Sequence, residues 1–234
     1  MKQINQFITE YIIKKKLDKP IDSEDHYEYS PETKDELINI INILLDKKET
    51  DLNCIDTSKI TDMSELFYNK EDINIDVSKW NVSNVEDMNR MFYNCGDFNC
   101  DLSNWDVSKV ENMERMFHYC EKFNCDLSNW NVSKVKNMSY MFYRCENFDC
   151  DLSNWDVSNV EKIDHMFCEC RIFIGKGLDN WNISKKVVDM SNMFDGCRKF
   201  NCDLSKWNTK GVKDMRYMFY NCNSLKNKPN WYKA

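Results

Sequence analysis

Glycine and proline are scarce in this sequence, with five and three among 234 residues. Collagen-like and low-complexity disordered chains need far more of both, so the composition excludes them. The chain also lacks an apolar run of about 18 residues, which a membrane-spanning helix requires. Aromatic residues instead make up 13% of the chain. We therefore expect an ordered, soluble protein without membrane insertion.

An excess of positive charge is also missing. The chain has 32 Lys and Arg against 39 Asp and Glu, a net charge of -7. Nucleic acid repels such a protein, so we expect no nucleic-acid partner. The N-terminal "MKQINQFITEYIIKKKLDKP" has acidic and amide residues within its apolar part and no small-residue cleavage site, so it does not fit a secretory signal. The expected location is cytoplasmic.

What the sequence does contain is a repeat. Tryptophan recurs in steps of 25, 25, 25, 26, 26 and 24 residues, at Trp80, Trp105, Trp130, Trp155, Trp181, Trp207 and Trp231. Val, Met and Phe recur in the same register. A period of about 20 to 50 residues is typical of stacked repeat architectures. We expect successive units to stack and share one apolar core, because a lone unit cannot bury its aromatic side chains.

Within one unit, the spacing of apolar residues predicts the local structure. In "SNVEDMNRMFYNC", Val85 is followed by apolar residues 3, 6, 7 and 10 positions later, which indicates one face of a helix. A serine three residues before a glutamate predicts a capping box at Ser83/Glu86, Ser108/Glu111 and Ser158/Glu161. In "FNCDLSNWDV", Cys100 and Leu102 alternate with polar residues, as in a short strand. The predicted fold is an α/β, leucine-rich-repeat-like solenoid of 25-26-residue coils, each a short strand plus a helix.

The two ends differ from the repeat. Residues 1–50 are predicted to form an N-terminal helical region and cap, and residues 51–234 the repeat solenoid. Residues 4–12 have helical spacing, and "SPETKDELINIINILL" predicts a second helix with Ser30 as N-cap and Pro31 at its first position. The C-terminal "SLKNKPNWYKA" shows no capping helix. A structural or self-assembling role, including a homodimer through this uncapped end, is therefore an alternative hypothesis.

The cysteines and histidines do not form a recognisable catalytic or metal site. Most of the twelve cysteines fall in two columns five residues apart, whereas a zinc site needs closely set pairs that converge. Buried apolar cysteines are the expected role, and disulfides between coils in an oxidising compartment are the alternative. None of the three histidines, His26, His118 and His165, has a Ser, Cys or carboxylate partner at a recurring spacing, as a nucleophile and its base would require. We expect no enzyme, no cofactor and no bound metal.

A row of polar residues on the strand side of the coils is the candidate partner-binding face. Its members are Asp76, Asp101, Ser103, Asn104, Asp126, Ser128, Asn129, Asp151, Ser153, Asn154 and Asp203. The aspartates could hold cations or a basic partner, or each could accept backbone N–H groups in an Asx turn. The amides of Asn99, Asn124 and Asn201, with Asp149 in the same column, could bond backbone between coils. The coil carrying Gly175, Lys176 and Gly177 has one extra residue and predicts a kink or a small partner-binding loop.

The stretches "FNCDLSNWDVSKVENMERMFHYC" and "IDTSKITDMSELFYN" resemble the BspA-like leucine-rich-repeat proteins with the Mycoplasma-lipoprotein-type repeat. The resemblance covers about residues 50–228. It implies a leucine-rich-repeat-like solenoid without catalytic residues, used in adhesion or protein recognition, and a cell-surface location as the alternative to the cytoplasm. The sequence thus predicts a non-enzymatic protein-protein recognition scaffold with an unidentified protein partner.

Overall fold

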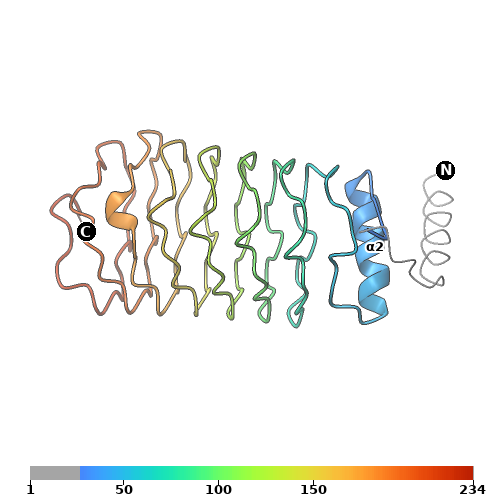
Figure 1. Ribbon diagram of the computed structural model, residues 1–234. Helices are drawn as coiled ribbons and strands as arrows, with labels where there is room; N and C mark the ends of the chain where they lie inside the picture. Colours follow the sequence, from blue (N-terminus) through green and yellow to red (C-terminus); the bar gives the residue numbers. More distant parts are fainter. Residues whose placement is uncertain (1–26, 234) are drawn as a thin grey trace.

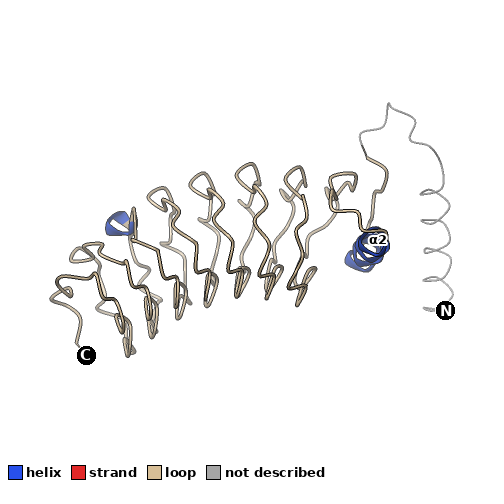
Figure 2. Cartoon of the chain, turned by 90° about the horizontal axis from the view of Figure 1, so that it is seen from below, coloured by secondary structure: helices blue, strands red, loops and turns tan. Residues whose placement is uncertain are grey.

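The computed structural model describes residues 27–233. This part of the chain forms a stack of coils, with helix α2 (Lys34–Asp46) at the N-terminal end (Figure 1). A short 3-10 helix, η1 (Leu178–Asn180), lies toward the other end. Figure 2 shows that turns and loops make up the remaining described residues. The helix predicted at residues 4–12 and His26 lie outside the described residues.

Helix α2 covers the first coils with one apolar face. Its buried side chains are those of Leu37, Ile40, Ile41 and Leu44, at the three- and four-residue spacing of a helix. The predicted helix is confirmed, but its predicted start is wrong by a few residues. Thr33, not Ser30, is the N-cap, and its side chain accepts the Glu36 N–H at 3.2 Å. The domain boundary after residue 50 stays a prediction.

The predicted α/β leucine-rich-repeat-like solenoid, with a strand and a helix in each coil, is wrong. Among residues 27–233, α2 is the sole α-helix, and the coils pair through isolated parallel bridges rather than extended strands. The serines predicted to cap repeat helices therefore cap none. Ser83, for example, lies in a turn in which its N–H donates to the Asn81 side chain. Each coil is instead a succession of tight turns.

Hydrogen bonds between coils explain why the predicted repeat helix does not form. In residues 88–94, every second N–H donates to a carbonyl of the next coil, at 2.7–2.9 Å: Met88 to Asn112, Arg90 to Glu114, Phe92 to Met116 and Asn94 to His118. In an α-helix these N–H groups would bond within the segment. The N–H groups of Met91 and Cys95 close turns onto carbonyls three residues back. This three-residue spacing imitates the apolar periodicity of a helix.

Left-handed backbone at two positions of each coil also stops a helix. Arg90 and Asn94 have φ of 52° and 56°. Non-glycine residues occupy most of the equivalent positions: Glu65, Asn69, Arg115, Tyr119, Tyr140, Arg144, His165, Glu169, Asn192, Tyr217 and Asn221. Each such residue costs about 1–2 kcal/mol of backbone strain, which the ladder between coils and the core must offset. Because the residues are not glycines, the sequence carries no signal for them.

The predicted strand at Cys100 and Leu102 is also absent. The Leu102 N–H donates to the Cys125 sulfur of the next coil at 3.0 Å, and the Trp105 N–H closes a turn onto the Leu102 carbonyl at 3.1 Å. The sulfur thus replaces a ladder carbonyl here. The alternation of apolar and polar residues does not come from a strand. It arises because side chains on either side of this turn face the core, as Leu102 does, or the solvent, as Asp101 does.

The aromatic core confirms that like side chains of successive coils touch. Trp130 lies between Trp105 and Trp155, with ring centroids 6.5 Å from each and planes within 2°. Its Nε1 donates to the buried Leu102 carbonyl of the preceding coil at 3.0 Å. Phe92 and Phe117 stack beside this column, 5.7 Å apart. The tryptophans therefore fill the core and add a second hydrogen bond to carbonyls that already close a turn, as the Leu102 carbonyl does with the Trp105 N–H.

The asparagine column adds a second link between coils, as the sequence predicts. Asn99 Oδ1 accepts the Asn124 N–H at 2.8 Å, and Asn124 Oδ1 accepts the Asp149 N–H at 3.0 Å. Asp149 continues the column by accepting the Ile174 N–H at 3.0 Å. These bonds hold the neighbouring coils in one register along the side that carries the candidate face.

Close packing against the neighbouring coils explains the two glycines of the irregular coil. Gly177 has φ of +86°, and a Cβ there would lie 2.3 Å from the Ser153 nitrogen. Gly175 is similarly confined, because its Cβ would lie 2.5 Å from the Phe200 ring. The extra residue of this coil is accommodated where η1 forms. The two glycines therefore let this coil approach its neighbours, and the kink and loop hypotheses both stay predictions.

Candidate functional site

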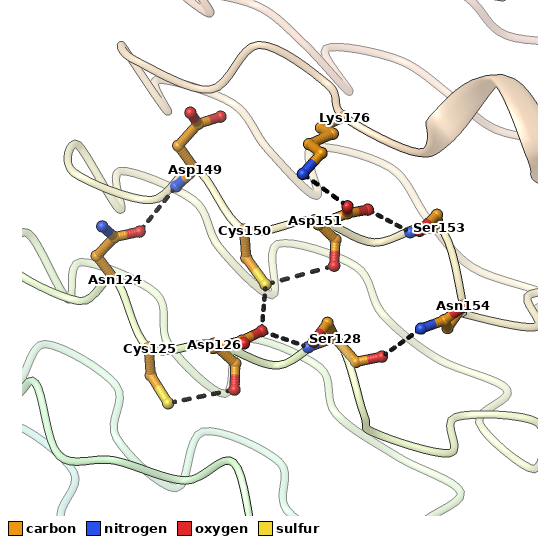
Figure 3. Close-up of a pocket in the computed structure, with 10 residues that line it drawn as sticks. All are labelled: Asn124, Cys125, Asp126, Ser128, Asp149, Cys150, Asp151, Ser153, Asn154 and Lys176. Atoms are coloured by element: carbon orange, nitrogen blue, oxygen red, sulfur yellow. Dashed lines mark hydrogen bonds and ion pairs between the residues drawn. The ribbon is translucent and has the colours of Figure 1, made fainter.

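A groove of about 460 Å³ lies on the predicted partner face (Figure 3). The residues that line it are Asn124, Cys125, Asp126, Ser128, Asp149, Cys150, Asp151, Ser153, Asn154 and Lys176. They come from three successive coils, whose equivalent side chains lie beside one another because the ladder between coils fixes the register. The groove is thus a product of the repeat rather than of one unusual segment.

Each aspartate of the row occupies an Asx turn. Asp126 Oδ1 accepts the Ser128 N–H at 2.9 Å and the Cys150 S–H at 3.6 Å. Asp151 Oδ1 accepts the Ser153 N–H at 3.0 Å. The Asx-turn interpretation is therefore confirmed for these residues. The Asx turn still allows a partner to bind, because both hydrogen bonds to Asp126 use Oδ1. Asp126 also forms no ion pair within residues 27–233.

The structure brings only part of the predicted face into the groove. Asp126, Ser128, Asp151, Ser153 and Asn154 line it. The remaining predicted residues lie outside the lining, all in other coils except Asn129, which follows Ser128: Asp76, Asp101, Ser103, Asn104, Asn129 and Asp203. Their aspartates repeat the Asx turn, with N–H donors from Ser78, Ser103 and Ser205 at 2.9 Å. The binding role of the whole face stays a prediction.

The turns keep the row of aspartates charged. The Ser128 backbone N–H holds the pKa of Asp126 below its ordinary value, and the Ser103 N–H does the same to the pKa of Asp101. The adjacent carboxylates oppose this weakly, because each Asp raises the pKa of its neighbour. The backbone donors outweigh that repulsion. A line of negative charge at neutral pH follows.

A lysine from the irregular coil binds one end of the row. Lys176 Nζ lies 2.9 Å from Asp151 Oδ2, and this hydrogen bond lowers the pKa of Asp151 to about 2 (Figure 3). The contact between Lys176 of the irregular coil and the aspartate row was not predicted. The signal was present, because Gly177 stands where the next Asp of the row would be and the basic residue comes just before it. The groove therefore already holds an ammonium group.

A comparison of sequences identifies the family. A family profile described as "Mycoplasma protein of unknown function, DUF285" matches residues 39–154 and again residues 137–233. The chain belongs to the DUF285 family. The two matches overlap, as a repeated unit allows. They agree with the Mycoplasma-type part of the resemblance and do not confirm its BspA-like leucine-rich-repeat part. No curated protein and no solved structure matches the chain significantly.

The twelve cysteines of this DUF285 chain are all free thiols. In the inner column, the S–H of Cys145 donates to the Phe117 carbonyl of the preceding coil at 2.9 Å, and burial raises the pKa of this thiol well above its ordinary value. In the outer column, the Cys150 sulfur accepts the Leu127 N–H at 3.1 Å, and burial raises its pKa to about 11. The cysteines therefore pack and bond between coils. The expected buried role is confirmed for eight of the twelve, whereas Cys54, Cys100, Cys202 and Cys222 are half-buried.

Two further findings apply to residues 27–233 only. No helix among them is long and apolar enough to cross a membrane. No group of three or more His, Cys, Asp or Glu side chains among them is arranged to hold a metal ion.

A second cavity, of about 340 Å³, lies on the last described coil. Arg216, Tyr217, Tyr220, Lys228 and Tyr232 line it. Tyr217 and Tyr220 are more than half exposed, and Lys228 Nζ lies 5.2 Å from the centre of the Tyr232 ring. This aromatic and basic cavity was not predicted, because Tyr217 and Tyr220 occupy repeat positions, those of Tyr140 and Tyr143, whereas Lys228 and Tyr232 follow the last repeated segment.

Proposed function

We propose that this DUF285 protein is a non-enzymatic recognition module whose aspartate row binds a basic segment of a partner protein. The row offers carboxylates at a constant position in successive coils, so an extended segment can place a cation at several of them. The BspA-like resemblance, which implies adhesion or protein recognition, supports the same class of function. Neither a nucleic acid nor a cofactor is part of the proposal.

The ion pair between Lys176 and Asp151 is the observation that carries this proposal. It joins an ammonium group to the row with good geometry, Nζ to Oδ2 at 2.9 Å, while both side chains stay partly exposed. Asp126, in the adjacent coil, has the same turn and the same groove but no such partner within the described residues. A lysine of another protein can therefore bind Asp126 as Lys176 binds Asp151.

The experiment measures binding of a hexalysine peptide by calorimetry. We expect the double variant Asp101→Lys/Asp126→Lys to lose binding, because attraction in the row becomes repulsion. Lys176→Ala should strengthen binding by about two- to five-fold, since it releases Asp151 from an exposed pair worth about 1 kcal/mol or less. An unchanged affinity in both variants would reject the aspartate row as the binding surface.

The control is Asp106→Lys/Asp156→Lys. These two aspartates are exposed and form the same Asx turns, with Ser108 and Ser158 N–H donors at 3.0 Å. They lie after the tryptophans and do not line the groove. The control changes the net charge by the same amount as the test variant, so an equal loss of binding would show that only overall charge attracts the peptide.

Self-association through the C-terminal coil stays the alternative hypothesis. In the last described coil, the N–H groups of Met215, Tyr217 and Phe219 correspond to those that earlier coils donate to the next coil. The Lys213 carbonyl corresponds to the carbonyls, such as that of Val188, that accept an N–H of the next coil. A symmetric end-to-end dimer could pair such donors and acceptors only where the two-fold axis brings them together, whereas the aspartate row needs no such match.

A further inference from the structure

A second surface, away from the aspartate row, combines tyrosine and arginine around a histidine. We define the His118 surface by Tyr93, Arg115, His118, Tyr119, Tyr143 and Arg144. They belong to the turn segments that form the ladder between coils, one segment per coil. Tyrosine and arginine are the residues most enriched where proteins bind one another tightly. Of these residues, only His118 stands out in the sequence, as one of three histidines without a catalytic partner.

The rings of this surface form an ordered stack. His118 lies between Tyr93 and Tyr143, with ring centroids 4.6 Å from each, and Tyr119 meets it edge-on at 4.6 Å. His118 is 7% exposed, and its Nδ1 is buried without a hydrogen-bond partner among the described residues. The stack therefore forms a rigid platform that needs no ordering on binding, which lowers the entropic cost of association.

One arginine of the surface has no acidic partner. Arg115 pairs with Glu114, and Arg90, in the preceding coil, pairs with Glu65 at 3.0 Å. Arg144 forms no ion pair within residues 27–233. Its guanidinium lies 5.3 Å from the centre of the Tyr119 ring, and its Nε is buried without a hydrogen-bond partner in the same residues. Only the Nε of this guanidinium is buried, and its terminal N–H groups donate to none of the described residues, so they are open to a ligand or to water.

We propose that the His118 surface binds an anionic side chain, a carboxylate or a phosphate monoester, carried by a partner polypeptide and held by Arg144. A guanidinium presents planar N–H donors that match the paired oxygens of either anion. The anion would lie at Arg144, because Glu114 already balances the charge of Arg115. The tyrosine rings on both sides supply apolar contact for the peptide that carries it.

His118 suits this role because it stays neutral. Burial first, and then the charges of Arg115, Arg144 and Arg90, lower the pKa of His118 to about 3. The imidazole therefore adds no charge that would vary with pH near neutrality. Because His118 is stacked in this surface, an anion bound at Arg144 would change the electric field at the imidazole ring. The NMR signals of that ring can therefore report binding.

The test titrates the full chain with hexaglutamate, with a tyrosine-phosphorylated peptide and with inorganic phosphate, while the His118 imidazole signals are followed by NMR. We expect a peptide to bind and to shift these signals. Arg144→Gln should weaken binding about ten-fold or more, because a charge-assisted hydrogen bond is lost. Arg144→Lys should weaken it less, because it keeps the charge without the planar donors. The peptide that binds more tightly identifies the anion as carboxylate or phosphate.

Arg171→Gln is the matched control. Arg171 carries the same charge in a nearby coil but is already paired, with Glu146 at 2.7 Å and Glu169 at 3.5 Å. Its loss should change the affinity less than two-fold. Equal weakening by both variants, no binding by either peptide, or tighter binding of a single-stranded oligonucleotide than of both peptides would overturn the proposal. The aspartate-row variants do not touch this surface, so the two proposals can fail separately.

Discussion

Trp130→Ala tests whether the column of stacked indoles stabilises the whole array. The indole of Trp130 is 2% exposed and lies between two others, and its Nε1 satisfies the Leu102 carbonyl. Truncation removes both stacking contacts, opens a cavity and removes one of the two hydrogen bonds to that carbonyl, which keeps the Trp105 N–H at 3.1 Å. A buried Trp→Ala change costs about 3–5 kcal/mol, and because the carbonyl stays bonded we expect about 4 kcal/mol for Trp130.

Trp231→Ala provides the internal comparison. Its Nε1 makes the same type of bond, to the Leu204 carbonyl at 2.8 Å, but Trp231 stacks only on Trp207 and is partly exposed. We expect a loss of about 1–2 kcal/mol, because less apolar surface is buried and fewer contacts are removed. The pair thus separates the effect of the indole from the effect of its place in the stack.

The assay is equilibrium unfolding in urea followed by circular dichroism, with each variant scaled to its own folded and unfolded baselines because the stacked indoles contribute to the signal. With a slope of about 3 kcal/mol per molar urea, Trp130→Ala should lower the midpoint by about 1.3 M and Trp231→Ala by about 0.5 M. Because each coil touches only its neighbours, the Trp130 variant should also broaden the transition. Equal shifts in the two variants, or a Trp130 shift below about 0.3 M, would refute the role assigned to the column.

Two further predictions concern backbone packing and pH. Gly177→Ala should destabilise the fold by more than the roughly 1–2 kcal/mol of left-handed strain, because the new Cβ would lie 2.3 Å from the Ser153 nitrogen. Gly96→Ala is the control, because its Cβ would lie 3.6 Å from the nearest atom and should cause no such loss. Thermal unfolding of the two variants measures the difference. The folded pKa of His118, about 3, is below its unfolded value of about 6.5, so the unfolded state binds the proton first and stability falls as pH drops from about 6.5 toward 3. His118→Phe should reduce that fall, measured as the free energy of unfolding at pH 7 and pH 4.5, and an equal fall in both proteins would contradict it.

The side-chain columns could be predicted from sequence, whereas the backbone path could not. Trp130 and its equivalents recur at a fixed period, and any stacked arrangement must bury them, so their contact follows from repetition alone. The asparagine links and the Asx turns of Asp126 and Asp151 follow from local side-chain chemistry. The helix prediction failed because turns closing three residues back place Val85, Met88 and Met91 on one side, as a helix does. Arg90 in a left-handed conformation gives no warning in the sequence.

The candidate sites divide in the same way. The aspartate row could be predicted because its column is nearly constant, with Asp at the same position of successive units. The contact of Lys176 with Asp151 could not, because it depends on how the irregular coil packs against the preceding one. The His118 surface was missed for a related reason. Its columns vary from unit to unit, and only the left-handed turn segments show which side chains meet.

The ladder between coils gives these two kinds of column different uses. It fixes the register, so a constant column such as that of Asp101, Asp126 and Asp151 becomes a row of identical groups, suited to a feature that recurs along a partner. A variable column in the same register places different residues side by side, as with Tyr93, His118 and Tyr143, and produces a site that exists once in the molecule. A partner that engages both surfaces would therefore be positioned along the stack by the His118 surface, because the row alone allows a shift by one coil at little cost.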